Sequence, residues 1–169
     1  MEHYRQFNTY KEGLDLDTLR QWVAFVERGC FKYMVHNDGE GKNYCTGFAF
    51  EGEFVADFPN CMYSKPANIS IIAYTTCEIR LIDGNCLKQL FDSNDNMKEL
   101  HGNIYKNLFL QIYSQYLDIY RMTVKERYIQ LLRRSPHIVQ LINLKDIASF
   151  LKVTPTTISK IRKEITFST

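Results

Sequence analysis

The chain of 169 residues is 45% hydrophobic, enough for a packed core in one medium domain or two small ones. No run approaches the roughly 18 apolar residues of a membrane span, and residues 1–11 lack the apolar core of a signal peptide, so we expect a cytoplasmic protein without a membrane partner. The net charge of +2 divides unevenly. Residues 1–120 carry 11 Lys and Arg against 16 Asp and Glu, a net of −5, and residues 121–169 carry 10 against 3, a net of +7. This asymmetry indicates either a polyanionic partner for the C-terminal third or a basic solvated surface.

The sequence contains no recognisable motif of an enzyme or a metal site. Five cysteines stand at positions 30, 45, 61, 77 and 86, without a CxxC pair or a histidine at zinc spacing. We interpret them as reduced core thiols rather than ligands of zinc or an iron–sulfur cluster. The four histidines show no metal spacing, and no GxSxG elbow is present. We therefore expect no catalytic residue, no metal and no resident cofactor.

Residues 22–82 have the pattern of short antiparallel strands. Residues 31–35 alternate in character, a turn rich in Asn, Asp and Gly follows, and residues 44–50 return as an aromatic-rich run. Residues 69–74 and 77–82 have the composition of buried strands. The pattern predicts an antiparallel barrel or sandwich.

A long helix is predicted over residues 97–122, after a short helix over 87–91 and good N-cap residues at 93–95. Its apolar side chains form two adjacent stripes, which together cover roughly 220° at 3.6 residues per turn. A helix packed only on its own domain needs an apolar arc of little more than about 100°. We expect the surplus apolar surface of the helix to contact a second copy of the chain in a homodimer. The alternative is a helix enclosed within one monomer. The expected dimer contacts are Leu100, Ile104, Leu108, Ile112, Tyr116 and Ile119.

A domain boundary is predicted between Met122 and Thr123. Thr123 and Glu126 form a capping box that starts a new helix through Arg134, and Ser135-Pro136 ends it. The charge changes sign at the same place. The predicted domains are therefore 1–122, with the long helix at about 95–122, and 123–169.

Two short helices separated by a tight turn are predicted in the basic C-terminal region. Asn143 caps the first, and Thr154 with Pro155 opens the second. This pattern is typical of a helix-turn-helix, with Ala148 as the small residue that lets the helices approach. The alternative is an ordinary amphipathic helical hairpin with a solvated lysine face.

The residues of this unit suggest how it would contact duplex DNA. Ile158, Ile161 and Ile165 share one face of the last helix, opposite Thr156, Lys160 and Lys163. Lysine and threonine side chains can reach base edges in the major groove, while further cations and a helix start can hold phosphates. The predicted DNA-binding residues are Lys145, Thr154, Thr156, Thr157, Lys160, Arg162 and Lys163.

Taken together, these segments resemble the cyclic AMP receptor protein/Fnr (Crp/Fnr) family of bacterial transcription factors. WVAFVERG at 22–29 resembles the family's strand and glycine turn, FEGEF at 50–54 its glycine–glutamate segment, and IASFLKVTPTTISKIRK at 147–163 its DNA-reading unit. The resemblance implies an α+β chain with a cyclic-nucleotide-binding-like β jelly-roll barrel, a long dimerisation helix and a C-terminal helix-turn-helix of winged-helix type. DNA half-sites would lie about one helical turn apart. The chain ends just past the last helix, so no wing is expected.

The resemblance also implies a ligand site in the barrel, at Gly52, Glu53, Phe54, Ala67 and Asn68. Family members that bind cyclic nucleotides use the Gly-Glu pair for the ribose and an arginine for the cyclic phosphate, but Ala67 stands where that arginine would be. A buried phosphate without a cationic partner costs several kcal/mol. We expect no response to cyclic AMP; the effector is another small molecule or none, and Glu53 is then a turn carboxylate.

Two further departures concern the helix-turn-helix itself. Lys152 takes the turn position where the family has glycine, which predicts a non-glycine residue at positive φ. Thr156 stands where many relatives have glutamate, so their target sequence does not carry over.

The sequence thus favours a homodimeric, DNA-binding transcriptional regulator. The alternative is a small-molecule sensor whose shortened C-terminal region mediates protein contacts instead of tight DNA binding.

Overall fold

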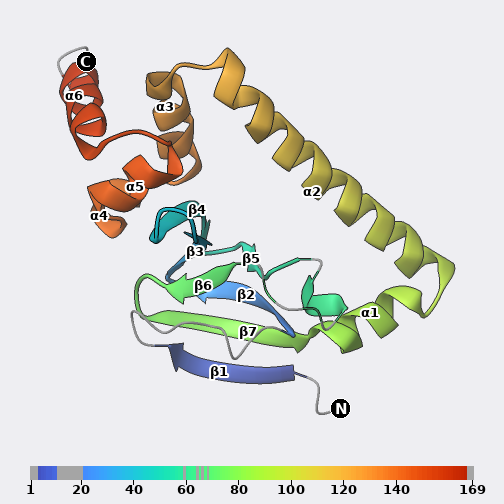
Figure 1. The fold of residues 1–169 in the computed structure, drawn as a ribbon. Coiled ribbons are helices and arrows are strands. Elements are labelled where there is room, and N and C mark those ends of the chain that lie inside the picture. Colours follow the sequence, from blue (N-terminus) through green and yellow to red (C-terminus); the bar gives the residue numbers. More distant parts are fainter. Residues whose placement is uncertain are drawn as a thin grey trace.

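The computed structural model describes residues 21–58, 60–63, 65, 67 and 69–166, together with the backbone of residues 4–10. Strands occupy the first half of the chain and helices the second (Figure 1). The strands are β1 (Tyr4–Tyr10), β2 (Trp22–Arg28), β3 (Cys30–Asn37), β4 (Lys42–Phe50), β5 (Phe54–Val55), β6 (Ser70–Ala73) and β7 (Cys77–Asp83), with a 3-10 turn, η2 (Asn60–Met62), after β5. The helices are α1 (Gly84–Asp92), α2 (Asp95–Arg121), α3 (Val124–Arg134), α4 (Ile138–Leu141), α5 (Leu144–Phe150) and α6 (Pro155–Thr166).

The strands form two antiparallel sheets that pack face to face. One sheet has the order β1-β7-β2-β5 and the other β4-β3-β6. Between them lies an apolar core that includes Val26, Phe31, Val55 and Ile79, each at most 2% exposed. Within the described ranges no ladder joins the two sheets, so the expected barrel is not closed. The edge strands are β1 and β5 in one sheet and β4 and β6 in the other. Of these, β5 and β6 have only two and four residues, which offer few backbone groups for a further ladder.

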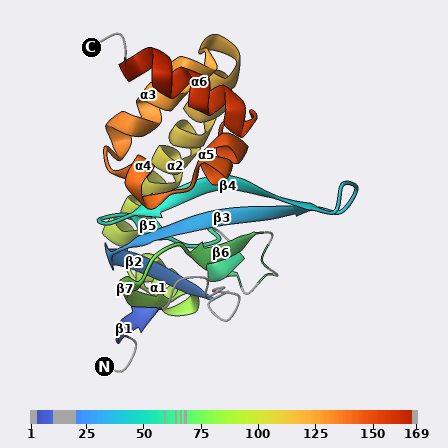
Figure 2. The ribbon, with the colours of Figure 1, turned by 90° about the vertical axis from the view of Figure 1, so that its left-hand side faces the viewer.

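The predicted hairpin between β3 and β4 is confirmed. Its ladder runs from the pair Cys30 and Phe50 to the pair Asn37 and Lys42. Asn37 Oδ1 accepts a hydrogen bond from the Glu40 amide at 3.1 Å, and Gly41 takes a φ of 60°, which glycine adopts without strain. The tip of the hairpin projects well beyond the rest of the sheet (Figure 2).

The three-stranded sheet is covered on both faces, which makes the molecule three layers deep. In β4 the side chain of Ala49 joins the core between the sheets, whereas Phe48 and Phe50 join a second core with helices α3 to α6. Figure 2 shows these helices on one side of β3 and β4 and the other sheet on the opposite side. The consecutive apolar residues of β4 are explained by this double burial, because neighbouring side chains of a strand point to opposite faces.

The long helix α2 begins at an asparagine cap, close to its predicted start. The Asn94 side chain accepts a hydrogen bond from the Met97 amide at 3.0 Å. Ile104 and Tyr105 of its N-terminal half pack against a cluster formed by Val23, Cys61, Met62 and Phe91. The C-terminal half then extends away from the sheets to the level of α3 (Figure 1).

The predicted caps of α3 and α5 are confirmed. Thr123 accepts from the Glu126 amide at 3.2 Å, and the Glu126 carboxylate accepts from the Thr123 amide at 2.8 Å, which completes the capping box. The Thr123 amide, and after it the Thr123 hydroxyl, donate to the Glu126 carboxylate, favour its charged form and lower the pKa of Glu126. Asn143 caps α5 through the Asp146 amide at 2.8 Å. The predicted domain boundary at 122/123 coincides with the end of α2, and the division into two domains stays a prediction.

Helix α4 was not expected from the sequence. Its four residues begin two positions after Pro136, and they are too few to produce a helical period. Ile138 is fully buried in the core under α3 to α6, so packing rather than local propensity explains the turn of helix.

The interpretation of the cysteines as core thiols is confirmed for Cys30, Cys45, Cys61 and Cys77, which are buried, while Cys86 is half-buried. Burial raises the pKa of Cys30 and of Cys45 to about 12, because the thiolate loses its hydration. In the part of the chain that the structure describes, no helix combines the length and the hydropathy needed to cross a bilayer.

Lys152 adopts a left-handed backbone, as its place in the turn predicts. Its φ is 58°, and no other described residue except glycine has a positive φ. We expect Lys152→Gly to raise the free energy of unfolding by about 0.5 to 1 kcal/mol, since glycine removes the strain of this conformation at some entropic cost. Lys152→Ala keeps a Cβ at the same φ and is the control, for which we expect no gain. Denaturant unfolding checks both, and a lower stability of the glycine variant would contradict the expectation.

Candidate nucleic-acid interface

The start of helix α6 is held by its own side chains. Thr154 Oγ1 accepts from the Thr157 amide at 3.3 Å and lies 2.9 Å from Thr157 Oγ1, while Pro155 takes the first helical position. This confirms the predicted cap, and it leaves the Thr156 side chain directed to solvent in the first turn. The amides of that turn, with the positive end of the helix dipole, form a suitable site for a phosphate.

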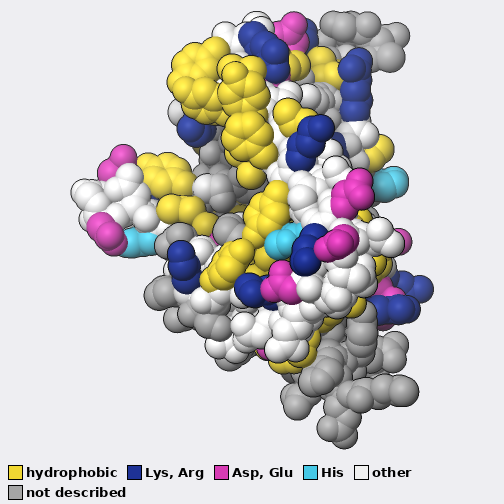
Figure 3. Space-filling view, turned by 90° about the vertical axis from the view of Figure 1, so that its right-hand side faces the viewer, with side chains coloured by type: hydrophobic (Ala, Val, Ile, Leu, Met, Phe, Trp, Pro, Cys, Tyr) yellow, Lys and Arg dark blue, Asp and Glu magenta, His cyan; other side chains and the backbone are white. Residues whose placement is uncertain are grey.

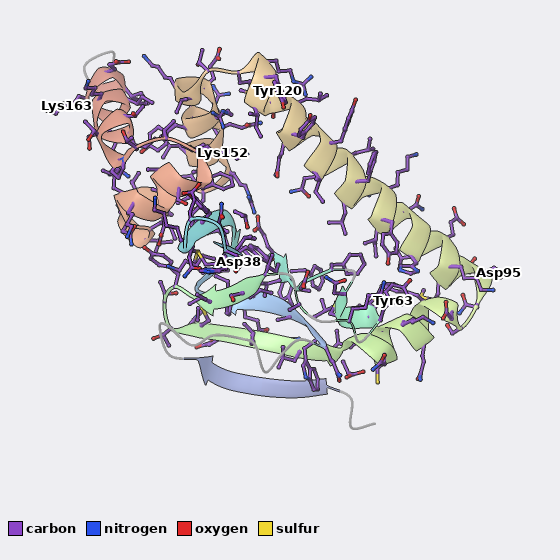
Figure 4. All side chains as sticks on the ribbon, viewed as in Figure 1. Asp38, Tyr63, Asp95, Tyr120, Lys152 and Lys163 are labelled. Atoms are coloured by element: carbon purple, nitrogen blue, oxygen red, sulfur yellow. The ribbon has the colours of Figure 1, made fainter. Side chains whose placement is uncertain are left out.

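Helix α6 has one buried face and one exposed face. Ile158 and Ile161 are 0% and 7% exposed, and they anchor the helix in the core of α3 to α6. On the other side Thr156, Lys160 and Lys163 are all exposed. Figure 4 shows Lys163 on the side of α6 that faces away from α2. The outer face of α6 therefore presents a hydroxyl and two ammonium groups in one row, free of cover from the rest of the chain.

Most of the other predicted DNA-binding residues are also accessible to solvent. Lys145 at the start of α5 and Thr154 in the turn are exposed, and Thr157 is half-buried. Arg162 makes contacts within the chain. Its Nε donates to the Tyr128 hydroxyl at 2.9 Å, and its guanidinium lies 5.9 Å from the centre of the Tyr128 ring. Arg162 thus ties α6 to α3 through Nε, and its predicted role at phosphates stays a prediction.

The predicted ligand carboxylate, Glu53, makes an ion pair within the chain. Arg134 Nη2 lies 2.6 Å from Glu53 Oε2, and Arg134 Nε donates to Oε1 at 3.1 Å. Glu53 Oε2 also accepts from the Phe50 amide at 3.1 Å, and Gly52 holds the turn with a φ of 82°. Glu53 is therefore a turn carboxylate, as one alternative had it, and in addition the partner of an arginine 81 positions along the chain. No sequence pattern pointed to that partner.

The other predicted ligand residues that the structure describes, Phe54 and Ala67, add no charged or polar side chain beside Glu53. Phe54 is 70% exposed, and its ring contacts that of Phe25 with centroids 5.2 Å apart. Ala67 is half-buried and offers no charge, and Asn68 lies outside the described residues. Among the residues that can be described, no group of three His, Cys, Asp or Glu side chains is arranged to hold a metal ion.

The C-terminal half of α2 leaves a broad apolar face uncovered. Phe109 and Ile112 are each 65% exposed and Tyr120 is 73% exposed, and Figure 3 shows the hydrophobic side chains gathered along this half of the helix. Of the six predicted dimer residues, Leu100, Ile112, Tyr116 and Ile119 are exposed, Leu108 is half-buried, and Ile104 packs within its own chain.

A cavity of about 1040 Å³ lies between this half of α2, helix α3, the turn before α6 and strand β4. Its lining includes Ile112, Tyr116 and Ile119 from α2, and Leu131 and Val153 from the other side. Apolar side chains thus line two opposite walls of an open space.

Comparison with known proteins identifies the fold. No family model matches the sequence, and no curated protein is a match. Solved structures do match. FixK2 from Bradyrhizobium japonicum has a TM-score of 0.80 at 15% identity, over 98% of this chain and 85% of that one. A transcriptional regulator assigned to the crp/fnr family from Eubacterium rectale has a TM-score of 0.73 at 14% identity, over 99% and 80% of the two chains.

A third structure extends the same likeness. A variant of CooA from Carboxydothermus hydrogenoformans has a TM-score of 0.68 at 14% identity, covering 99% of this chain and 78% of that chain. The matches span both the sheets and the C-terminal helices. The similarity therefore includes the order of these elements along the chain and their arrangement in space. The chain therefore has the fold of the Crp/Fnr family of regulators.

Proposed function

We propose that the protein is a transcriptional regulator that binds duplex DNA as a homodimer and does not respond to cyclic AMP. The observation that carries the proposal is the outer face of α6, where Thr156, Lys160 and Lys163 are exposed opposite two buried isoleucines. The regulators whose fold it shares support this role.

The chemistry of the exposed face suits a recognition helix in the major groove. Lys160 can donate to guanine O6 and N7, and the Thr156 hydroxyl or methyl can contact a neighbouring base. Lys145, Lys163 and the amides at the start of α6 would hold backbone phosphates. Arg162 Nε also donates to the Tyr128 hydroxyl, so we expect these lysines to make most of the phosphate contacts.

The uncovered face of α2 supports a homodimer built on this helix. A second α2 would bury the stripe from Leu108 to Tyr120 and would also supply apolar side chains to the cavity between α2 and α3. Leaving so large an apolar surface in water is unfavourable by about 25 cal/mol for each Å². A two-fold axis along paired α2 helices would present two copies of α6, which fits two half-sites on DNA.

The effector site is the part in which this chain departs from a cyclic-nucleotide binder. The Glu53 carboxylate is already paired with Arg134, and the core between the sheets is filled by side chains such as Phe31 and Ile79. Ala67 stands where the resemblance expects an arginine, and Arg134, which lies beside Glu53, is already engaged by that carboxylate. We propose that the protein acts either without a small-molecule effector or with one of different chemistry.

We expect the protein to bind duplex DNA with an affinity that falls steeply as salt rises, because lysine–phosphate contacts release counterions. Lys160→Ala should weaken binding to a duplex selected by the wild type by about 1 to 3 kcal/mol while changing binding to random duplex little. Lys98→Ala, which removes an exposed lysine paired with Asp95 on α2, is the matched control and should bind like the wild type. Fluorescence anisotropy over a salt series measures all three proteins.

Absence of binding at low salt would refute the DNA-binding proposal and favour a role in protein contacts. If Lys160→Ala and Lys98→Ala lose the same affinity for the selected duplex, Lys160 makes no specific contact with a base.

Cyclic AMP at millimolar concentration should leave the melting temperature unchanged, since a ligand that does not bind the native state cannot stabilise it. Differential scanning fluorimetry with AMP as a matched non-cyclic control makes the test. A clear upward shift with the cyclic nucleotide alone would show that another group takes the place of the missing arginine.

Ile112→Glu should convert the dimer to a monomer at micromolar concentration, because it places a charge in the centre of the proposed α2 contact. Leu90→Glu is the control, since Leu90 is a similarly exposed apolar residue on α1, away from that face. Light scattering gives the mass of each. A wild type of monomer mass, or a dimer that survives Ile112→Glu, would contradict the α2 interface.

A further inference from the structure

We propose that Glu53 and Arg134 are a positioning pair that fixes the recognition helix on the sheets without a ligand. The inference rests on the proposed DNA-binding function and concerns how the helical unit, defined as helices α3 to α6 (residues 124–166), is oriented for it. The carboxylate that the family resemblance assigns to a ligand is used here to join two parts of one chain.

The geometry of the pair is specific. Arg134 is the last residue of α3, and its guanidinium donates from Nε and Nη2 to the two oxygens of Glu53. Nη2 also donates to the Phe48 carbonyl at 3.1 Å, and the guanidinium carbon lies 5.5 Å from the centre of the Phe50 ring. An arginine fork bound to both carboxylate oxygens fixes direction as well as distance, which a lysine could not do.

Contacts within its own turn also hold Glu53 in place, independently of Arg134. The Phe50 amide donates to its carboxylate, and the Val26 amide donates to its carbonyl at 3.0 Å. The left-handed backbone of Gly52 closes the turn. Because both the turn and the end of α3 are fixed, little conformational entropy is lost when the two side chains meet.

Three further contacts cross the same junction at other points of the helical unit. Lys32 Nζ lies 3.0 Å from Asp146 Oδ2, and both side chains are at most 20% exposed. The Cys45 amide donates to Ser149 Oγ at 2.9 Å, and the Asn143 amide donates to the Tyr74 hydroxyl at 2.8 Å.

These three contacts hold α5 at its N-cap, at Asp146 and near its end at Ser149, whereas Arg134 holds the end of α3. The pair of Glu53 and Arg134 therefore restrains the unit at a point that the three contacts on α5 do not reach.

The junction leaves the outer face of α6 open. The helical unit contacts the sheet through α5 and through Arg134 at the end of α3, whereas Thr156, Lys160 and Lys163 remain exposed. The pair therefore holds the unit in an orientation that can still meet DNA. In a homodimer, a fixed orientation in each copy sets one distance between the two recognition helices, and hence one preferred spacing of half-sites.

The test is a double-mutant cycle with Glu53→Gln, Arg134→Gln and the two combined. The probes are a duplex that the wild type selects from a random-sequence pool and the same duplex with one base pair inserted between its half-sites. We expect each single variant to lower the preference for the original spacing by about tenfold, and the combined variant to lower it no further, because each change breaks the same contact. Taking the ratio of two duplexes removes the effect of a lost positive charge on DNA affinity in general. Glu27→Gln breaks a comparable pair with Arg80 within one sheet and should leave the preference unchanged.

Amide hydrogen exchange of β4 and α5 gives a second readout that needs no DNA. Both single variants should accelerate exchange of these segments by a similar factor, and the combined variant by no more, if the pair closes the junction.

Additive effects, or wild-type exchange and spacing preference in the single variants, would overturn the positioning role. A wild type that binds no duplex would refute the proposed function instead, and the exchange cycle would then decide the positioning role by itself.

Discussion

The packing of helices α3 to α6 on the outer face of the β4-β3-β6 sheet is the interaction on which the rest of the structure depends. Phe48 and Phe50 of β4 lie in the same apolar core as Tyr128, Ile147 and the other buried side chains of these helices. The rings of Phe48 and Phe150 meet edge to face at 5.5 Å. The helices that carry the candidate DNA contacts thus complete their core with side chains of the sheet, so the position of α6 follows from the packing of the strands.

Local pairs, rather than overall charge, align this junction. The opposite net charges of residues 1–120 and 121–169 agree with the pair of Glu53 and Arg134. In the pair of Lys32 and Asp146, however, the lysine comes from the acidic part and the carboxylate from the basic part. The surplus of positive charge is therefore left on the exposed helix surfaces, where Lys160 and Lys163 lie. The same division explains why the junction and the candidate DNA interface do not compete for the same lysines.

Features with local causes could be predicted from the sequence, whereas contacts between distant segments could not. Asn94, Thr123 and Asn143 cap helices through amides only three positions away, and the left-handed Lys152 follows from the length of one turn. By contrast, the partners of Arg134 and Arg162 depend on how whole elements pack. The apolar stripe of α2 could be predicted from its helical period. The period could not indicate that Ile104 packs against its own chain rather than against a partner. The prediction of a closed barrel was not confirmed for a similar reason. Closure requires edge strands from two sheets to pair, and no local sequence pattern determines that.

A structure of the protein bound to a duplex that it has selected would test most directly whether the sheets hold the recognition helix ready for DNA. We predict two copies paired along α2, with α6 of each in a major groove, Lys160 within hydrogen-bond distance of a base, and the contact between Glu53 and Arg134 intact. A complex in which the helical unit has left the sheet, or in which α6 lies outside the groove, would contradict it.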